Sequence, residues 1–224
     1  MKLSVPVLMS TTAGYVDTAG FLALQGLFTA HVTGNFVTLG AALVFGTSGA
    51  IAKLLALPVF CVVILVTRLA AFSLPKFGLP VLRTMLSVQV LLLAVGAALA
   101  IQPGASVRGD NLVSIGAGMI LVAAMAIQNA ASRIHLASSP PTTLMTGTTT
   151  QIMIDVADLV RGLSGEARLL ATARVSKMFA NVAGFAVGCA GGAVLYGYLR
   201  MWCFVIAPFL ALVPILMSAT KEPV

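Results

Sequence analysis

Charge is the scarcest property of this sequence. Only 8% of its 224 residues are charged, and the acidic residues number six. Soluble domains carry about 25% charged residues, so a soluble protein is excluded. Hydrophobic residues make up 59% of the chain, and the mean hydropathy is +1.06. This composition is typical of an integral membrane protein.

Cysteines and metal ligands are also few. The three cysteines, Cys61, Cys189 and Cys203, lie in apolar segments without CxxC spacing, which argues against a disulfide framework or a zinc site. The two histidines are too far apart in sequence to form a metal-binding pattern. The chain also lacks HExxH motifs, GxSxG motifs and paired acids. We therefore expect no metal, no cofactor and no enzymatic activity.

Basic residues outnumber acidic ones, and the formal net charge is +7. A basic surface can bind nucleic acid, but here the basic residues mostly flank apolar runs, which is the positive-inside pattern of membrane proteins. The pattern predicts a lipid bilayer as the partner and no nucleic acid. The acids Asp155, Asp158 and Glu166 fall in a charged segment that we expect to be a solvated face.

The apolar runs predict an all-α, polytopic membrane bundle. A helix needs about 20 apolar residues to cross a bilayer, and the chain offers about six such runs. They cover residues 5–28, 51–72, 85–101, 112–131, 174–199 and 202–219. Two shorter segments, 36–45 and 142–154, are expected to be re-entrant or broken helices.

The two halves of the chain resemble each other. The Thr33-Gly34 pair recurs 113 residues later, and both halves have the order span, short Thr-Gly segment, span, span. This pattern predicts a duplication within one membrane domain. The first three-helix repeat is placed at 1–101, a linker loop at 102–111 and the second three-helix repeat at 112–224.

An odd number of crossings in each repeat requires that the two repeats be inverted relative to each other. This 3+3 inverted repeat, with both termini cytoplasmic, puts most basic residues on the inner side, as the positive-inside rule demands. The inner set is Lys2, Arg68, Lys76, Arg83, Arg133, Arg161, Arg168 and Lys221, and the outer set is Lys53, Arg108 and Arg200.

The segment 14–35 contains the candidate site. It is mostly apolar, yet Asp17 lies well inside it, and a carboxylate costs at least a few kcal/mol at the centre of a lipid-facing helix. Asp17 is therefore expected to face other helices or a water-filled cavity, as a candidate ion or substrate site with Tyr15 and His31. Alternatively, Asp17 holds helices together by bonding Tyr15, Asn181 or a backbone amide, and His31 is a loop residue.

The Thr-Gly pairs predict helix starts inside the membrane. The first turn of such a helix has unpaired N–H groups, which Thr33 or Asn35 can cap after a turn at Gly34. The same N–H groups can bind an anion, so ordinary capping and substrate binding both remain open. The candidates in the second half are Thr146, Gly147 and Thr148, with Gln128 and its neighbour Asn129 in the place of Asp17.

These features predict a small secondary transporter or channel for a small solute, with anions among the candidate substrates. The two Thr-Gly helix starts would bind the solute near the midplane, and Asp17 would couple a proton or a cation. The alternative is a non-transporting membrane scaffold or partner subunit. The stripe of Ala180, Gly184, Gly188 and Gly192 can serve either a homo-oligomer or internal packing.

Several runs resemble one known family. AGYVDTAGFL at 13–22, FTAHVTGN at 28–35 and the later IQNAASR and TLMTGT runs are similar to the YoaK-like family of bacterial membrane proteins, a domain of unknown function. The later runs match more loosely, since Thr148 stands where an asparagine would mirror Asn35. The resemblance implies a small, multi-pass protein of the bacterial inner membrane and brings no substrate with it.

Overall fold

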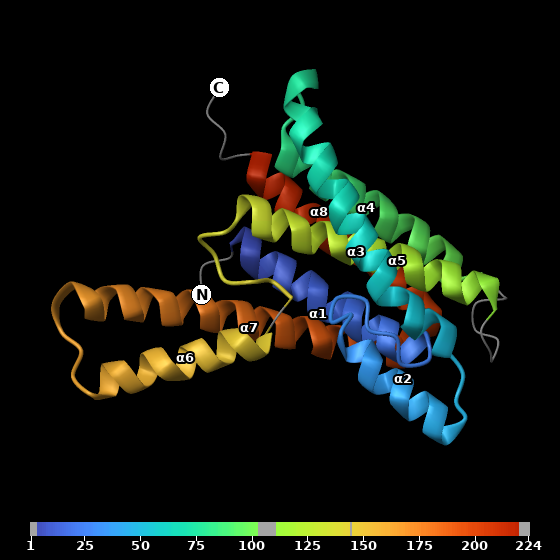
Figure 1. The fold of residues 1–224 in the computed structure, drawn as a ribbon, viewed down its shortest axis with the longest axis horizontal. Helices are drawn as coiled ribbons and strands as arrows, with labels where there is room; N and C mark the ends of the chain where they lie inside the picture. Colours follow the sequence, from blue (N-terminus) through green and yellow to red (C-terminus); the bar gives the residue numbers. More distant parts are fainter. Residues whose placement is uncertain (1–3, 103–110, 144, 220–224) are drawn as a thin grey trace.

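Residues 4–102, 111–143 and 145–219 are described by a computed structural model, and every regular element in them is a helix (Figure 1). In chain order the elements are α1 (Val5–Ala23), α2 (Gly34–Phe45), α3 (Ala50–Ser73), η1 (Leu74–Phe77), α4 (Val81–Ala100), α5 (Leu112–His135), α6 (Met145–Val160), α7 (Gly165–Leu199), η2 (Arg200–Val205) and α8 (Ile206–Ala219). The predicted all-α class is confirmed for these residues.

Four helical stretches of the described chain are long and apolar enough to cross a membrane. They are Ala50–Phe77, Val81–Ala100, Leu112–His135 and Gly165–Met217. The last stretch spans 53 residues, but the chain turns at Arg200, where φ is 52°, and α8 then packs against α1 and α4. Several helices can therefore span a membrane, whereas the number of about six crossings stays a prediction.

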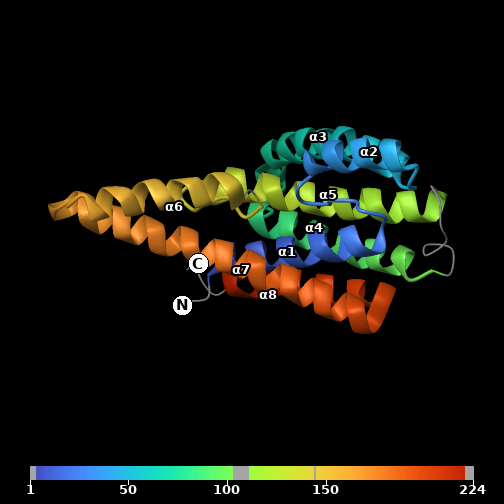
Figure 2. The ribbon, with the colours of Figure 1, turned by 90° about the horizontal axis from the view of Figure 1, so that it is seen from below.

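α1 lies in the interior of the bundle. It packs against α5, α7 and α8, and Figure 2 shows it between α5 and α8. Its buried residues include Tyr15 and Asp17, whose polar groups face protein, as polar groups in membrane helices usually do. α3 is the opposite case, because Leu54, Leu65 and Leu69 are exposed along it in the manner of a lipid-facing helix.

Glycines of α7 allow it to cross α1 at close range. A Cβ added at Gly188 would collide with the carbonyl oxygen of Thr11, and one at Gly192 would lie 2.7 Å from that of Tyr15. Any larger residue at these positions would push the two backbones apart. The small-residue stripe therefore serves internal packing between α1 and α7, which is one of the two uses predicted for it.

α6 and α7 form a hairpin that projects from the bundle, on the left of Figure 1. Asp155 of α6 is only 1% exposed and accepts hydrogen bonds of 2.6 Å from both Nε and Nη2 of Arg174. α6 is not among the candidate spans, and the hydrogen bonds from Arg174 hold the pKa of the Asp155 carboxyl below its ordinary value. The prediction that Asp155 lies on a solvated face is wrong, because the side chain is buried. The ion pair with Arg174 offsets the cost of this burial.

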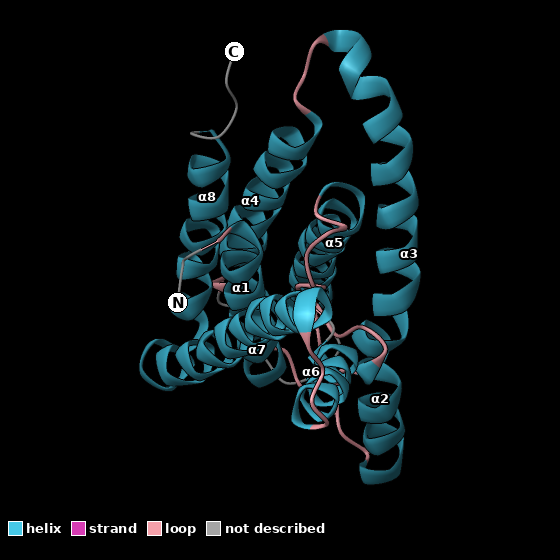
Figure 3. Cartoon of the chain, turned by 90° about the vertical axis from the view of Figure 1, so that its left-hand side faces the viewer, coloured by secondary structure: helices cyan, strands magenta, loops and turns pink. Residues whose placement is uncertain are grey.

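α2 packs against α3, and Figure 3 shows α2 at the lower end of α3. α2 buries little, and the side chains of Phe36, Val37 and Phe45 are exposed. The loop that joins α1 to α2 contains His31 and Thr33, two of the residues that the sequence singled out.

Candidate functional site

The chain reverses direction directly after α1. Gln25 and Gly26 both have positive φ, 57° and 82°, a backbone conformation that suits glycine and turns a helix end sharply. The residues that follow therefore lie beside the last turns of α1, and Leu27 is fully buried there. This reversal brings Thr29 and His31 back to the level of Asp17, although they are more than three helical turns away in sequence.

Asp17 fastens the returning loop to α1. Its Oδ1 accepts hydrogen bonds from the backbone N–H groups of Thr29 at 2.7 Å and Ala30 at 2.8 Å. Its Oδ2 lies 2.7 Å from Nδ1 of His31. Since the side chain of Asp17 is only 4% exposed, these bonds replace the water that an exposed carboxylate would bind. Among the alternatives predicted for Asp17, the bond to backbone amides is the one observed.

The two side-chain partners predicted for Asp17 bind elsewhere. Tyr15 donates its hydroxyl to the carbonyl oxygen of Cys203 at 2.7 Å, and Asn181 donates Nδ2 to the carbonyl oxygen of Pro140 at 3.2 Å. Tyr15 is therefore a link between α1 and η2, and it is not among the residues that line the cavity at Asp17.

Asn35 fastens the same loop from its other end. Its Nδ2 donates to the carbonyl oxygen of Phe28 at 2.7 Å, and its Oδ1 accepts from the N–H of Phe28 at 2.9 Å. Asn35 is 1% exposed, so the pair of bonds satisfies both polar groups of a backbone unit that has little access to water. Asn35 thus holds the loop in shape. It does not cap α2, although capping was one of the roles predicted for it.

The helix start at Gly34 does not offer an anion site. The N–H groups of Gly34, Asn35 and Phe36 donate to the carbonyl oxygens of three preceding residues at 2.8–3.2 Å, and the Thr33 side chain makes no capping hydrogen bond. The prediction that this turn exposes free N–H groups is therefore wrong, because the chain enters α2 through tight turns that use them. The loop amides that could bind an anion already bind Asp17.

A cavity of about 560 Å³ opens at the Asp17–His31 pair. It is lined by Asp17, Thr18, Phe21, Leu22, Phe28, His31, Thr33, Gly34, Phe185 and Cys189. The lining combines α1, the returning loop, the start of α2 and the middle of α7. Four predicted site residues of the first half, Asp17, His31, Thr33 and Gly34, therefore meet at one cavity. Asn35 does not line it but holds Phe28, which does.

Aromatic rings form one side of this cavity. The ring of Phe28 lies 4.9 Å from that of Phe21 and 6.5 Å from that of His31, and the His31 ring lies 5.2 Å from that of Phe185, centroid to centroid. Sequence reasoning missed all three phenylalanines. Phe28 opens the FTAHVTGN run, and Phe185 follows Gly184 of the small-residue stripe. Both therefore lie in or beside patterns found in the sequence, but no sequence signal indicates that they lie near Asp17.

His31 is a polar group of the cavity that a ligand can reach. An ionised carboxylate only accepts hydrogen bonds, so the bond to Asp17 places a proton on Nδ1 of His31 and leaves Nε2 available. The side chain of His31 is 30% exposed. Neutral His31 can therefore accept a hydrogen bond through Nε2, and protonated His31 can donate one. This orientation of a histidine by a buried acid is a common arrangement in proton-transfer sites.

The predicted residues of α5 lie outside this cavity. Gln128 donates Nε2 to the carbonyl oxygen of Met9 at 2.8 Å and accepts from Nε2 of Gln89 at 2.7 Å, in the buried contact of α1, α4 and α5. Asn129 donates Nδ2 to Oγ1 of Thr143 at 2.7 Å. Gln128 is therefore a packing residue, whereas Asn129 fastens the segment before α6 to α5.

The second Thr-Gly motif lies in the first turn of α6. Thr146 and Gly147 are exposed, and Thr148 is buried. None of the three is among the described residues that line the cavity at Asp17. The two motifs therefore do not share this cavity, and the predicted site of two opposed Thr-Gly helix starts is reduced to the one in the first half.

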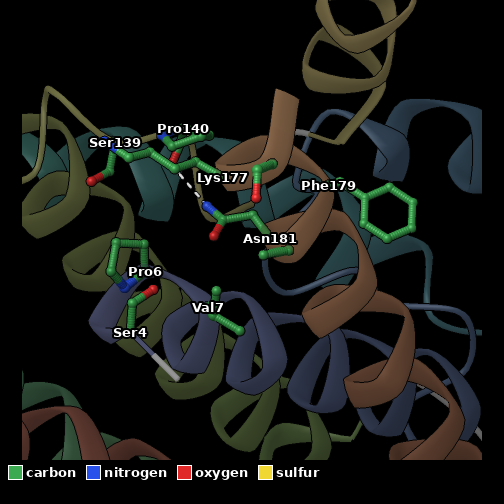
Figure 4. A pocket seen from close by; sticks show the side chains of 10 residues that line it. Ser4, Pro6, Val7, Ser139, Pro140, Lys177, Phe179 and Asn181 are labelled. Carbon is green, nitrogen blue, oxygen red and sulfur yellow. Dashed lines mark hydrogen bonds between the residues drawn. The ribbon is translucent and has the colours of Figure 1, made fainter. Parts of the chain in front are cut away.

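A larger cavity of about 710 Å³ lies between the start of α1 and the middle of α7 (Figure 4). Lys177, Asn181 and three serines line it, and Asn181 is bonded to the loop at Pro140. No predicted site residue lines it. Larger volume does not make it the better candidate, because the described residues that line it include neither an acid nor a histidine.

Within the described ranges, no group of three or more His, Cys, Asp or Glu side chains is placed to hold a metal ion. The profile of the family described as Protein of unknown function (DUF1275) matches residues 5–217. Comparisons with curated proteins and with solved structures gave no match. The chain belongs to the DUF1275 family.

Proposed function

We propose that this member of the DUF1275 family is a secondary transporter for a small solute in the bacterial inner membrane, and that it is not an enzyme. The solute site is the cavity at Asp17, and His31 carries the coupled proton. One observation supports this above all: the two most distinctive runs of the sequence, 13–22 and 28–35, converge on one cavity where His31 is bonded to the buried Asp17.

The pair suits proton coupling because histidine changes charge in the physiological pH range. Asp17 keeps the ring of His31 in one orientation through the 2.7 Å bond at Nδ1, so protonation acts at the other ring nitrogen, Nε2. Ionisable residues inside a membrane bundle commonly mark proton or ion pathways. The coupling role predicted for Asp17 alone is thus better assigned to the pair.

The packing of the helices supports the proposed inverted repeat. Exchanging α1 with α5, α2 with α6, α3 with α7 and α4 with α8 turns one set of contacts into another. The α1–α7 contact becomes α5–α3, the α4–α5 contact becomes α8–α1, and the α2–α3 contact becomes α6–α7, all of which occur. In Figure 2, α1 runs from left to right and α5 from right to left, as an inversion requires.

Hydrogen bonds in the segments that precede the two short helices, α2 and α6, also support the inverted repeat. Each of these two segments is called a break. Asp17 and His31 are 14 residues apart, and so are Asn129 and Thr143. Each pair fastens the segment before a short helix to the preceding long helix. Within the proposed repeat, the counterpart of Asp17 is therefore Asn129, in place of the Gln128 predicted from the sequence, and the second break has no charge.

Purified protein in phospholipid vesicles that contain a pH-sensitive dye tests the transport function. Benzyltrimethylammonium, benzenesulfonate, inorganic phosphate and glucose are added outside in turn. We expect at least one of them to drive proton movement above that of protein-free vesicles, His31→Gln to abolish it, and His135→Gln to keep it. His135 is the matched control because it is the other histidine of the chain and lies at the end of α5.

Two results would contradict the proposed function. One is proton movement equal to that of empty vesicles for all four probes. The other is movement that His31→Gln leaves unchanged, which would remove the cavity from the mechanism even if the protein transports.

The second candidate function is a non-transporting membrane scaffold. It is favoured by the way in which Asp17 and Asn35 are already satisfied by their own loop, so both have a sufficient structural role. The cavity that reaches Asp17 favours transport, since a scaffold has no need for it. A scaffold predicts that His31→Gln changes neither vesicle fluxes nor solute binding.

A further inference from the structure

The charge of the cavity at Asp17 limits what it can bind. Its lining residues, all in the described part of the chain, include one acid and one histidine, with no lysine or arginine. With Asp17 ionised, the cavity has a charge of −1 when His31 is neutral and 0 when it is protonated. An anion therefore never meets a net positive charge here, whereas a cation meets a negative one whenever His31 is neutral.

The aromatic rings point to the same preference. The faces of aromatic rings attract cations, and the attraction grows when the site is shielded from water. Phe21, Phe28 and Phe185 all line the cavity, and the rings of Phe28 and Phe185 flank that of His31. These apolar walls would bind a strongly hydrated ion poorly, but they can contact the carbon groups of an organic cation. The aromatic lining and the charge of the cavity thus both favour an organic cation.

We propose that the cavity at Asp17 binds a small organic cation, such as an alkyl- or arylammonium ion, in competition with the proton on His31. This proposal rests on the proposed function and names the substrate class of its site. The volume of about 560 Å³ lies within the range of small-molecule pockets. Binding would draw on the charge of Asp17 and the faces of the phenylalanines, while Asp17 keeps its bonds to the loop.

The competition follows from charge balance. When the cation enters, the imidazolium of His31 releases the proton on Nε2 to water and keeps the one on Nδ1, which is bonded to Asp17. One positive charge replaces another, and the cavity with its ligand stays neutral. Two other titratable groups face His31 across this cavity, Asp17 from α1 and Cys189 from α7, while α2 contributes none. A transporter built this way exchanges its cation for a proton.

The two histidines of the chain make the proposal testable by NMR. In ring-labelled protein carrying His135→Gln, the one remaining imidazole signal belongs to His31. We expect benzyltrimethylammonium to shift this signal and to lower the pH at which the ring titrates, whereas benzenesulfonate and inorganic phosphate leave it unchanged. Below that pH, the affinity for benzyltrimethylammonium should fall about tenfold for each pH unit, as competition with one proton requires.

Phe185→Leu removes the aromatic ring and keeps a bulky apolar side chain, so it tests the ring separately from the volume that the ring fills. We expect it to weaken benzyltrimethylammonium binding several-fold, while the His31 signal of the ligand-free protein confirms that the cavity is intact. Phe179→Leu is the matched control, because Phe179 is also on α7 but lines the other cavity. Equal binding by the two variants would show that aromatic faces do not hold the ligand.

The cation proposal and the transport proposal can fail separately. If the His31 signal responds to benzenesulfonate or phosphate and not to benzyltrimethylammonium, the cation class is overturned, even where those anions drive proton movement in vesicles. An affinity for benzyltrimethylammonium that is independent of pH overturns the competition with the proton. If benzyltrimethylammonium binds as described but none of the four probes moves protons in vesicles, the ligand class stands and transport is refuted.

Discussion

The two long helices that precede a short helix fasten it in similar ways, but with different chemistry. α1 uses the carboxylate of Asp17, which binds two loop amides and His31. α5 uses the neutral amide of Asn129, which binds the hydroxyl of Thr143. A neutral side chain is thus sufficient to hold such a segment. The charge of Asp17 is therefore not needed to hold the loop in place. Its additional effect is to orient His31 at the cavity.

The largest expected difference between the two breaks is in stability. Asp17→Ala leaves buried N–H groups without acceptors and should lower the free energy of unfolding by about 3–5 kcal/mol. Asn129→Ala removes one neutral hydrogen bond and should cost about 1 kcal/mol. Unfolding in mixed micelles by titration with a denaturing detergent, followed by circular dichroism, measures both. Equal losses would mean that the acid has no special role in the loop.

The far end of the first loop allows a finer test. Asn35→Ala should cost about 2 kcal/mol, because both backbone groups of Phe28 lose their partners. Thr33→Ala, two residues earlier, should cost less than about 0.5 kcal/mol, since its side chain is exposed and makes no capping bond. The same detergent titration compares them, and a loss at Thr33 as large as that at Asn35 would contradict the observed hydrogen bonds.

His31→Gln should separate folding from function. Glutamine keeps an N–H donor for Asp17, so the free energy of unfolding should fall by only about 1.5 kcal/mol, much less than for Asp17→Ala. Proton movement should be lost completely, whereas cation binding should persist without its pH dependence, because Asp17 and the phenylalanines still line the cavity. A variant that keeps proton movement and a pH-dependent cation affinity would place the titrating group elsewhere.

The second half also buries an acid, Asp155, but compensates it with Arg174. The Asp155 pKa is lowered on folding, so its contribution to stability is complete above the unfolded-state pKa of about 3.9 and is lost as the pH falls through the lower folded value. Because Arg174 is 53% exposed, solvent screens the pair, and the coupling should be small but favourable near neutral pH. A double-mutant cycle of Asp155→Asn and Arg174→Gln measures it at several pH values, and a coupling that grows as the pH falls would contradict this assignment.

The sequence predicted the all-helical membrane class and the position of the first site because composition and one buried acid are local signals. Asp17 and His31 were both identified, and they do bind each other. The sequence did not reveal the partners that depend on the path of the chain. The reversal at Gln25 and Gly26 returns Thr29 to Asp17, and the crossing of α7 over α1 adds Phe185 to the cavity.

Other errors came from reading short motifs as isolated pieces. Thr33, Gly34 and Asn35 have the composition of a helix cap, yet Asn35 bonds back to Phe28, a contact that only the folded loop defines. Asp155 lies in a charged segment and was read as solvated, because its partner Arg174 is in the next helix. Small apolar residues align easily, and so Gln128 and Asn129 could not be distinguished as counterparts of Asp17.

Access of a ligand to Cys189 tests the central claim most directly, because this thiol lines the cavity at Asp17. In protein carrying Cys61→Ala and Cys203→Ala, Cys189 is the only thiol left. Its labelling by a water-soluble methanethiosulfonate reagent is followed by intact-protein mass spectrometry, with and without benzyltrimethylammonium. A solute cavity predicts that Cys189 is labelled and that the cation slows labelling, with protection lost in His31→Gln,Asp17→Asn protein. Labelling at the same rate with and without the cation would contradict a binding site beside Asp17.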